Sequence, residues 1–208
     1  MHGRVVAQLA WSPEGKLLLE KPFAADGRPA GLEVEYDDAG RVIWLAHWVA
    51  GEMHGPAMQF DTDGLPVIVT EFVHGRGIDI WMSCGRVSEV RTTYNNIPDG
   101  LVRWGDPTRP DQEESFAAGK RHGIFRSWDR GRLQAGYPMF YVDDLEVTRE
   151  AYLSACAADC PLPPYNESDD SNERSMPPAV RDGVQRAKQL RSGFSLASYL
   201  QHARATLA

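Results

Sequence analysis

One feature of this chain constrains its fold more than any other: an aromatic residue recurs every 21 to 25 residues between positions 11 and 128. Most copies lead into a short tip that ends in glycine, with intervening residues such as SPE, DDA and DTD that favour turns. The aromatic residues of this phase are Trp11, Tyr36, Phe60, Trp81, Trp104 and Trp128. Such a period is typical of chains that stack small units, none of which buries a core alone. We expect these side chains to be structural and to form a ladder along a sheet.

A second series lies about half a period away from the first. It places an aromatic residue three positions before a glycine, as in WVAG, FVHG and FAAG. Further glycines, which we expect at the turns that return the chain to the next hairpin, are Gly31, Gly55, Gly77, Gly100 and Gly123. Between the turns lie segments such as RVIWLAHWV and LPVIVTEFV, which are rich in strand-forming residues. Each period therefore predicts one β-hairpin, five to six in all.

The two series together resemble a known repeat. The segments WVAGEMHGPAMQF and FAAGKRHGIFRSW are similar to the MORN repeat and to its variant form in bacterial proteins, and FVHGRGIDIW and YNNIPDGLVRW are partial copies. The resemblance covers about residues 11–141. It implies a mainly β fold, an elongated antiparallel sheet of stacked hairpins, and a scaffold role. The bacterial variant is often described as antitoxin-like.

The periodicity stops after the repeats, and the rest of the chain reads as helices. We expect a repeat domain over 1–145, a helix over 146–165 that begins at Thr148 and caps the sheet, a mobile acidic linker over 166–178, and C-terminal helices over 179–208. Apolar residues at helical spacing in the last part are Val180, Val184, Ala187, Leu190, Leu196, Leu200, Ala203 and Leu207. These helices either pack on the sheet or dock on another molecule, and self-association through them is one possibility.

Histidines and cysteines are the residues that most invite a chemical interpretation. His54, His74 and His122 each precede a glycine of the repeat, and Asp99 holds that place in another copy. A row of histidines can bind metal, but the gaps match no compact ligand motif, so we favour a turn role. Other candidates are Cys156 and Cys160 on one helix face, which we expect to be structural, and Cys84 at a hairpin tip.

The most individual part of the repeat region is the segment GDPTRPDQEE, which interrupts the regular tips. It predicts a charged, protruding loop that could contact a partner through Arg103, Asp106, Arg109 and Asp111. The alternative is a tolerated surface insertion. No spacing in the chain indicates a catalytic motif, a metal site or a cofactor site, so we expect a protein that is not an enzyme.

Charge and composition limit the partners. The formal net charge of −7 disfavours sequence-independent binding of nucleic acid and of anionic membranes. Neither a signal peptide nor a long apolar segment is evident, and three cysteines do not make a disulfide framework, so we expect a cytoplasmic protein. The sequence thus predicts a non-enzymatic scaffold that binds a protein partner through its sheet. The alternatives are an antitoxin or immunity protein, and an enzyme whose site lies in the last third of the chain.

Overall fold

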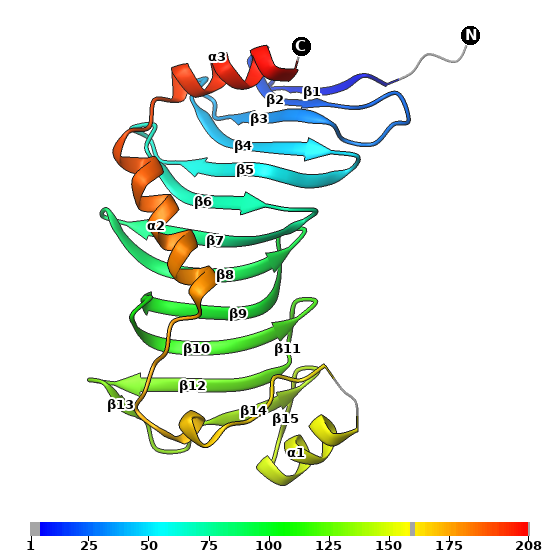
Figure 1. Ribbon diagram of the computed structural model, residues 1–208. Coiled ribbons are helices and arrows are strands. Elements are labelled where there is room, and N and C mark those ends of the chain that lie inside the picture. Colours follow the sequence, from blue (N-terminus) through cyan, green and yellow to red (C-terminus); the bar gives the residue numbers. More distant parts are fainter. Residues whose placement is uncertain (1–4, 159–160, 208) are drawn as a thin grey trace. The chain divides into compact units, whose positions relative to one another are not determined.

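The computed structural model describes residues 5–158 and 161–207. It confirms the predicted fold class: a 15-stranded antiparallel sheet comes first, and the helices follow (Figure 1). The strands are β1 (Ala7–Trp11), β2 (Leu17–Pro22), β3 (Gly31–Tyr36), β4 (Val42–Val49), β5 (Glu52–Phe60), β6 (Pro66–Phe72), β7 (Arg76–Ser83), β8 (Arg86–Tyr94), β9 (Ile97–Asp106), β10 (Arg109–Ala117), β11 (Lys120–Arg121), β12 (Gly123–Asp129), β13 (Arg132–Leu133), β14 (Met139–Val142) and β15 (Leu145–Val147).

Strands that follow one another in sequence pair with one another in the sheet. The order is β1-β2-β3-β4-β5-β6-β7-β8-β9-β10-β12-β14-β15, while β11 pairs with β10 and β13 pairs with β12. The helices are α1 (Arg149–Ala157), a short 3-10 helix η1 (Glu167–Asp170), α2 (Pro178–Ser192) and α3 (Leu196–Leu207). The chain forms two compact units, residues 1–77 with 183–208 and residues 78–182, and each is described by itself.

The tips of the first series are stabilised by their own first residue. The Asp37 carboxylate accepts hydrogen bonds of 2.9 Å from the backbone N–H groups two and four residues later. The Asp61 carboxylate accepts the same two hydrogen bonds from the N–H groups of Asp63 and Leu65. In the first tip, the Ser12 hydroxyl accepts from the N–H groups two and four residues later, at 3.2 and 3.3 Å. The glycine near the end of the tip takes a left-handed conformation, with a φ of 78° at Gly40. The predicted hairpin tips are therefore confirmed at these positions.

The turns between hairpins are tighter and contain two residues. In Ala50–Gly51, between β4 and β5, both residues have positive φ, 53° and 90°. His74–Gly75 repeats this between β6 and β7, with φ values of 49° and 74°. Paired positive φ angles define the type I′ turn, whose twist matches that of antiparallel strands. Asn95–Asn96 replaces the glycine-containing pair in one copy, because asparagine tolerates left-handed angles better than most residues.

The prediction that Gly31, Gly55, Gly77, Gly100 and Gly123 are turn residues is wrong: all five lie in strands. Gly55 belongs to a bulge, since the chain advances two residues on β4 from Ala46 to Trp48 but four on β5 from Met53 to Ala57. A bulge glycine takes a φ of 98° here, which a side chain resists. At Gly77 the reason is space, because a Cβ atom would lie 2.7 Å from the Thr70 side chain. These glycines therefore bend the strands rather than reverse them.

In the first unit, the last part of the chain folds back onto one face of the sheet. This covered face contains an in-register row of fully buried or nearly fully buried apolar side chains, Val34, Leu45, Met58 and Val69. The contacts that hold the helices there involve aromatic rings: Phe60 lies 5.5 Å from Phe194, centroid to centroid, and the His47 ring is hydrogen-bonded to the Tyr199 hydroxyl at 2.9 Å. Burial raises the pKa of Tyr199 to about 12, with a smaller contribution from the charge of Glu71.

In the second unit, α1 covers the end of the sheet (Figure 1). Its first turn begins as predicted, because the Thr148 hydroxyl accepts a hydrogen bond of 3.2 Å from the Ala151 N–H group. The helix places Tyr152, which is completely buried, against Phe140 of β14, with ring centroids 5.1 Å apart. Leu162 and Ile124 complete this cluster. These contacts support the interpretation of this helix as a cap.

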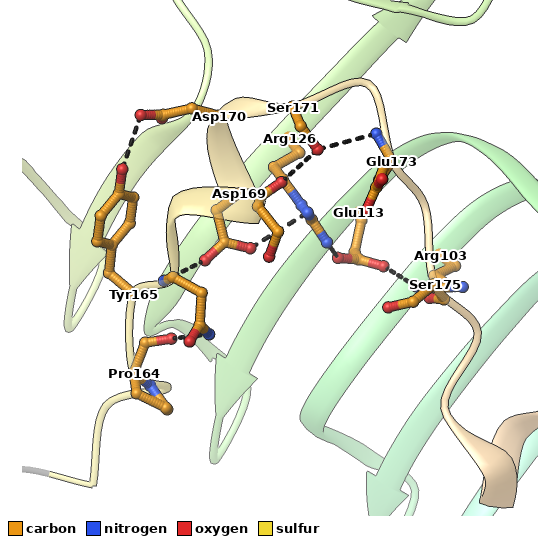
Figure 2. Close-up of polar contacts among 12 residues, drawn as sticks. Arg103, Glu113, Arg126, Pro164, Tyr165, Asp169, Asp170, Ser171, Glu173 and Ser175 are labelled. Carbon is orange, nitrogen blue, oxygen red and sulfur yellow. Dashed lines mark hydrogen bonds and ion pairs between the residues drawn. The ribbon is translucent and has the colours of Figure 1, made fainter.

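The structure revises the interpretation of residues 166–178 as a mobile linker, because this segment is bonded to the sheet along its length (Figure 2). Arg126 of β12 forms an ion pair of 3.2 Å with Asp169, and the Leu133 N–H group donates to Asn172 at 2.8 Å. Further along, Arg174 donates to the Pro110 carbonyl at 2.7 Å. The sequence pattern suggested mobility because it contains few apolar residues, but polar contacts replace apolar anchors here. We call residues 166–177 the strap.

Candidate functional site

The sheet face opposite the covered face is the best candidate for a binding surface, and we call it the open face. In the first unit it includes Lys21, Glu33, Glu35, Trp44 and Trp48. In the second unit it includes Asp79, Trp81, Glu89, Arg91 and Trp104. Alternation along each strand places these side chains opposite the apolar row and the strap. The open face is therefore lined by rings and charges, and in the first unit Trp44 and Trp48 pack against a buried apolar cluster on this same face, which consists of Ala46, Met53, Ala57 and Phe72.

Three groups on the open face share one composition, a cation that lies over an aromatic ring and pairs with a buried carboxylate. In the first unit, Lys21 Nζ lies 4.2 Å from the centroid of the Trp48 ring and 3.0 Å from Glu33. The second unit has two such groups. Their members are Arg91, Trp81 and Asp79 in one, and Arg121, Tyr141 and Glu114 in the other.

In each of these groups the cation is stabilised by two neighbours, the carboxylate and the aromatic ring. Arg91 donates from Nε and from Nη2 to Asp79, at 3.1 and 2.9 Å, while its guanidinium carbon lies 5.3 Å from the Trp81 ring centroid. A cation in this position is attracted by the negative face of the ring and by the carboxylate together. Each group is complete within the chain, so its charges are neutralised.

Two further rows on the open face repeat one composition, glutamate–tryptophan–glutamine. In the first unit, Glu35 of β3 is directly opposite Trp44 of β4, which is directly opposite Gln59 of β5. In the second unit the same order runs across β8, β9 and β10, as Glu89, Trp104 and Gln112. Directly opposed residues have Cβ atoms about 5 Å apart, so each carboxylate lies beside an indole ring. The glutamines are exposed, and the other four residues are half-buried.

The carboxylates of these rows differ from those of the neutralised groups. Among the residues that the structure describes, neither Glu35 nor Glu89 makes an ion pair or a hydrogen bond. Burial raises the pKa of Glu35, with a further contribution from the charge of Glu33. Burial also raises the pKa of Glu89, where Arg91 lowers it and Asp79 raises it. Each row therefore presents a partly desolvated carboxylate that is not directly paired, although the cation of the neighbouring group, Lys21 for Glu35 and Arg91 for Glu89, lowers its pKa.

The candidate histidines serve the turns of the neighbouring hairpins. The His54 ring accepts a hydrogen bond of 3.4 Å from the backbone N–H group of His74, the first residue of a type I′ turn. Asp99 accepts from the Ala118 N–H group in the same way at 3.1 Å, and His122 accepts from that of Asp143 at 3.3 Å. The turn role favoured by the sequence is thus supported, although the side chain supports the next turn along rather than its own.

The predicted partner-contact loop is not a loop, because β9 and β10 continue to Asp106 and Arg109 and leave a turn of only two residues. Asp106 caps this turn by accepting from the Thr108 N–H group at 2.8 Å. Asp106, Arg109 and Asp111 are exposed, as expected. Arg103 is only 2% exposed, so the prediction that it contacts a partner is wrong.

Arg103 instead belongs to a buried charge network that binds the strap (Figure 2). It forms an ion pair with Glu113 on the adjacent strand, and it donates to the carbonyl groups of Pro107 and Ser175. Glu113 also accepts from Arg126, which in turn forms an ion pair with Asp169 of the strap. The sequence gives no signal for this network, because its members come from three strands and from a segment more than forty residues later.

The six repeat aromatics do not form one ladder. Phe60 packs on the covered face against Phe194, and Trp128, also buried, lies beneath Arg174 of the strap. Trp81 and Trp104 lie on the open face. The strand bulges explain the division, since each extra residue changes which face a given phase occupies.

Two of the six have other environments. Tyr36 is half-buried in β3. Trp11 is 56% exposed, because β1 pairs only with β2 and forms the edge of the sheet. The Trp11 ring is therefore not buried, in contrast to what we expect of a structural aromatic residue.

The remaining candidates show no clustered chemistry. Cys84 is exposed in the turn Cys84–Gly85, Cys156 is half-buried in α1, and Cys160 lies outside the described residues. Within residues 5–158 and 161–207, no group of three or more histidine, cysteine, aspartate or glutamate side chains is placed to hold a metal ion. None of the helices in the same residues is both long enough and apolar enough to span a membrane.

No protein-family model matches the sequence, and no curated protein matches it. The class that the fold defines is a β-hairpin repeat protein with C-terminal helices. Its most distinctive surface is the open face, whose rows and groups arise from strand register.

Proposed function

We propose that this chain is a non-enzymatic binding protein of the MORN-like kind, which uses the open face of its sheet to bind a protein partner. The observation that carries the proposal is the difference between the two faces in each unit. The covered face lies beneath the chain's own C-terminal third. Its apolar row is buried in that packing and is not available to a partner. The open face keeps half-exposed tryptophans and charges, which are the residue types that dominate protein interfaces.

The composition of the open face favours a polypeptide over a small molecule. A small-molecule site is usually a concave, mostly apolar pocket. The open face instead offers rings and polar groups that repeat from strand to strand, as a partner that spans several strands requires. Its exposed glutamines, Gln59 and Gln112, provide amide donors and acceptors for such a partner.

Site-specific photocross-linking tests the proposal. A photoreactive phenylalanine analogue is introduced at Gln59 or Gln112 on the open face, and at Thr62 or Arg130 in exposed hairpin tips as matched controls. Full-length protein is cross-linked in cells of its native host. We expect one discrete cross-linked product from the open-face positions and none from the tips. Cross-links from the tips alone, or from no position, contradict the proposal.

A further inference from the structure

The two Glu–Trp–Gln rows indicate what kind of partner the open face takes. In each unit, a row lies on the same face as a complete group of cation, ring and carboxylate. The row in the second unit has the ring, Trp104, and the carboxylate, Glu89, side by side on adjacent strands. Within the described residues, no lysine or arginine completes this pair, whereas Arg91 completes the group of Trp81 and Asp79. The row is thus the same arrangement with its cation missing.

The first unit also has one complete group of cation, ring and carboxylate beside one row that has only the ring and the carboxylate. Lys21 lies over Trp48 and pairs with Glu33, while Trp44 and Glu35 are adjacent and have no cation of their own in the described part of the chain. On the open face of each unit the complete groups are neutral and the row adds one carboxylate, and in the second unit Glu146, directly opposite Tyr141, adds another. A partner of complementary charge is therefore cationic at the rows.

We propose that each Glu–Trp–Gln row binds an arginine side chain of an extended segment in the partner protein, with the guanidinium over the indole ring and paired with the glutamate. This inference rests on the proposed function and specifies its partner as a basic polypeptide segment. Arginine fits better than lysine, because a planar guanidinium stacks on an indole ring and pairs with a carboxylate at the same time. The glutamine at the end of each row, Gln59 or Gln112, is exposed and can bond the backbone of the segment.

The state of the two carboxylates agrees with this assignment. Burial raises the pKa of Glu35 and of Glu89, so their ionised forms are incompletely stabilised in the chain alone. An incoming guanidinium supplies the missing counter-charge and, at the same time, covers the ring. Such a desolvated pair contributes more to binding than an exposed ion pair does.

Fluorescence anisotropy with a defined probe tests the inference. The probe is a fluorescein-labelled peptide of alternating arginine and serine, and a matched peptide carries citrulline, which has the shape of arginine without its charge. The full chain is compared with Glu35→Gln, Glu89→Gln and the double variant. Controls for the net charge of −7 are Glu14→Gln in an exposed tip and Glu150→Gln, exposed in the first turn of α1. Glutamine preserves the shape of the side chain, so the fold is retained.

We expect each row variant to weaken binding of the arginine peptide about fivefold, which corresponds to the loss of one partly desolvated ion pair. The double variant should weaken it further, and both controls should change the Kd less than about twofold, as expected for exposed charges. Equal loss in the controls, or equal binding of the citrulline peptide, overturns the inference. If these tests fail while cross-links still arise at Gln59 and Gln112, only the arginine assignment fails. Cross-links confined to the tips refute the proposed function itself.

Discussion

Removing the carboxylate of Glu113 should cost this protein a large part of its stability. Arg103 is 2% exposed and has Glu113 as its ion-pair partner. Burial lowers the pKa of the Arg103 guanidinium, and the charge of Glu113 opposes this effect. Glu113→Leu leaves that guanidinium buried with only the Pro107 and Ser175 carbonyl groups as acceptors. Breaking a buried pair in this way costs about 3–5 kcal/mol.

Urea denaturation followed by tryptophan fluorescence measures this loss. For a chain of 208 residues with a urea dependence of about 3 kcal/mol per molar, the midpoint should fall by about 1–2 M. Glu146→Leu, at an exposed position of β15, is the matched control and should change the free energy of unfolding by less than about 0.5 kcal/mol. The double variant Arg103→Met with Glu113→Leu removes both charges and should recover at least half of the loss, since Arg126 keeps Asp169.

Two results would refute the reasoning. A loss of less than about 1 kcal/mol in Glu113→Leu means that the network is solvated and that Arg103 does not depend on its partner. A double variant that is less stable than the single variant means that the loss comes from packing instead of an unpaired charge. Limited proteolysis provides a second readout, because release of the strap in Glu113→Leu should make residues 171–177 the first site of cleavage.

Other predictions follow from burial and from the pKa shifts. Met58→Ala on the covered face should cost about 2–5 kcal/mol in thermal or urea unfolding, and Leu65→Ala, at an exposed position, less than about 1 kcal/mol. Because burial raises the pKa of Glu89 in the folded state, its ionised form destabilises the fold above that pKa; Glu89→Gln should therefore increase the free energy of unfolding at pH 7, with the difference lost below about pH 4. His74→Asn should retain the melting temperature, since asparagine also adopts the left-handed φ of 49° found there. A chain that ends at Tyr165 should lose stability in calorimetry because it exposes the apolar row, and its solution mass, compared with that of the full chain, tests self-association through the helices; an unchanged melting temperature contradicts the packing of α2 and α3 on the sheet.

The hairpins could be predicted from the sequence because their causes are local. An aspartate such as Asp37 and a glycine three residues later contain the whole chemistry of a tip, since every bond that closes it lies within five residues. The alternation of two turn types along the chain then predicts strands of known length, and short connections predict antiparallel neighbours. The cap at Thr148 is equally local. For these elements the residue types and their spacing were sufficient.

What lies on each face was decided only by the tertiary structure. The bulges at positions such as Gly55 change the phase of side-chain alternation by amounts that the period does not reveal, so the repeat aromatics divide between two faces. The same register brings Glu89, Trp104 and Gln112 into one row, although their spacing in sequence differs from that of the first row. The burial of Arg103 depends on the strap, which is distant in sequence and polar in composition. Local spacing determines the turns, whereas register and distant packing determine which side chains meet, because both depend on the sum of many contacts across strands.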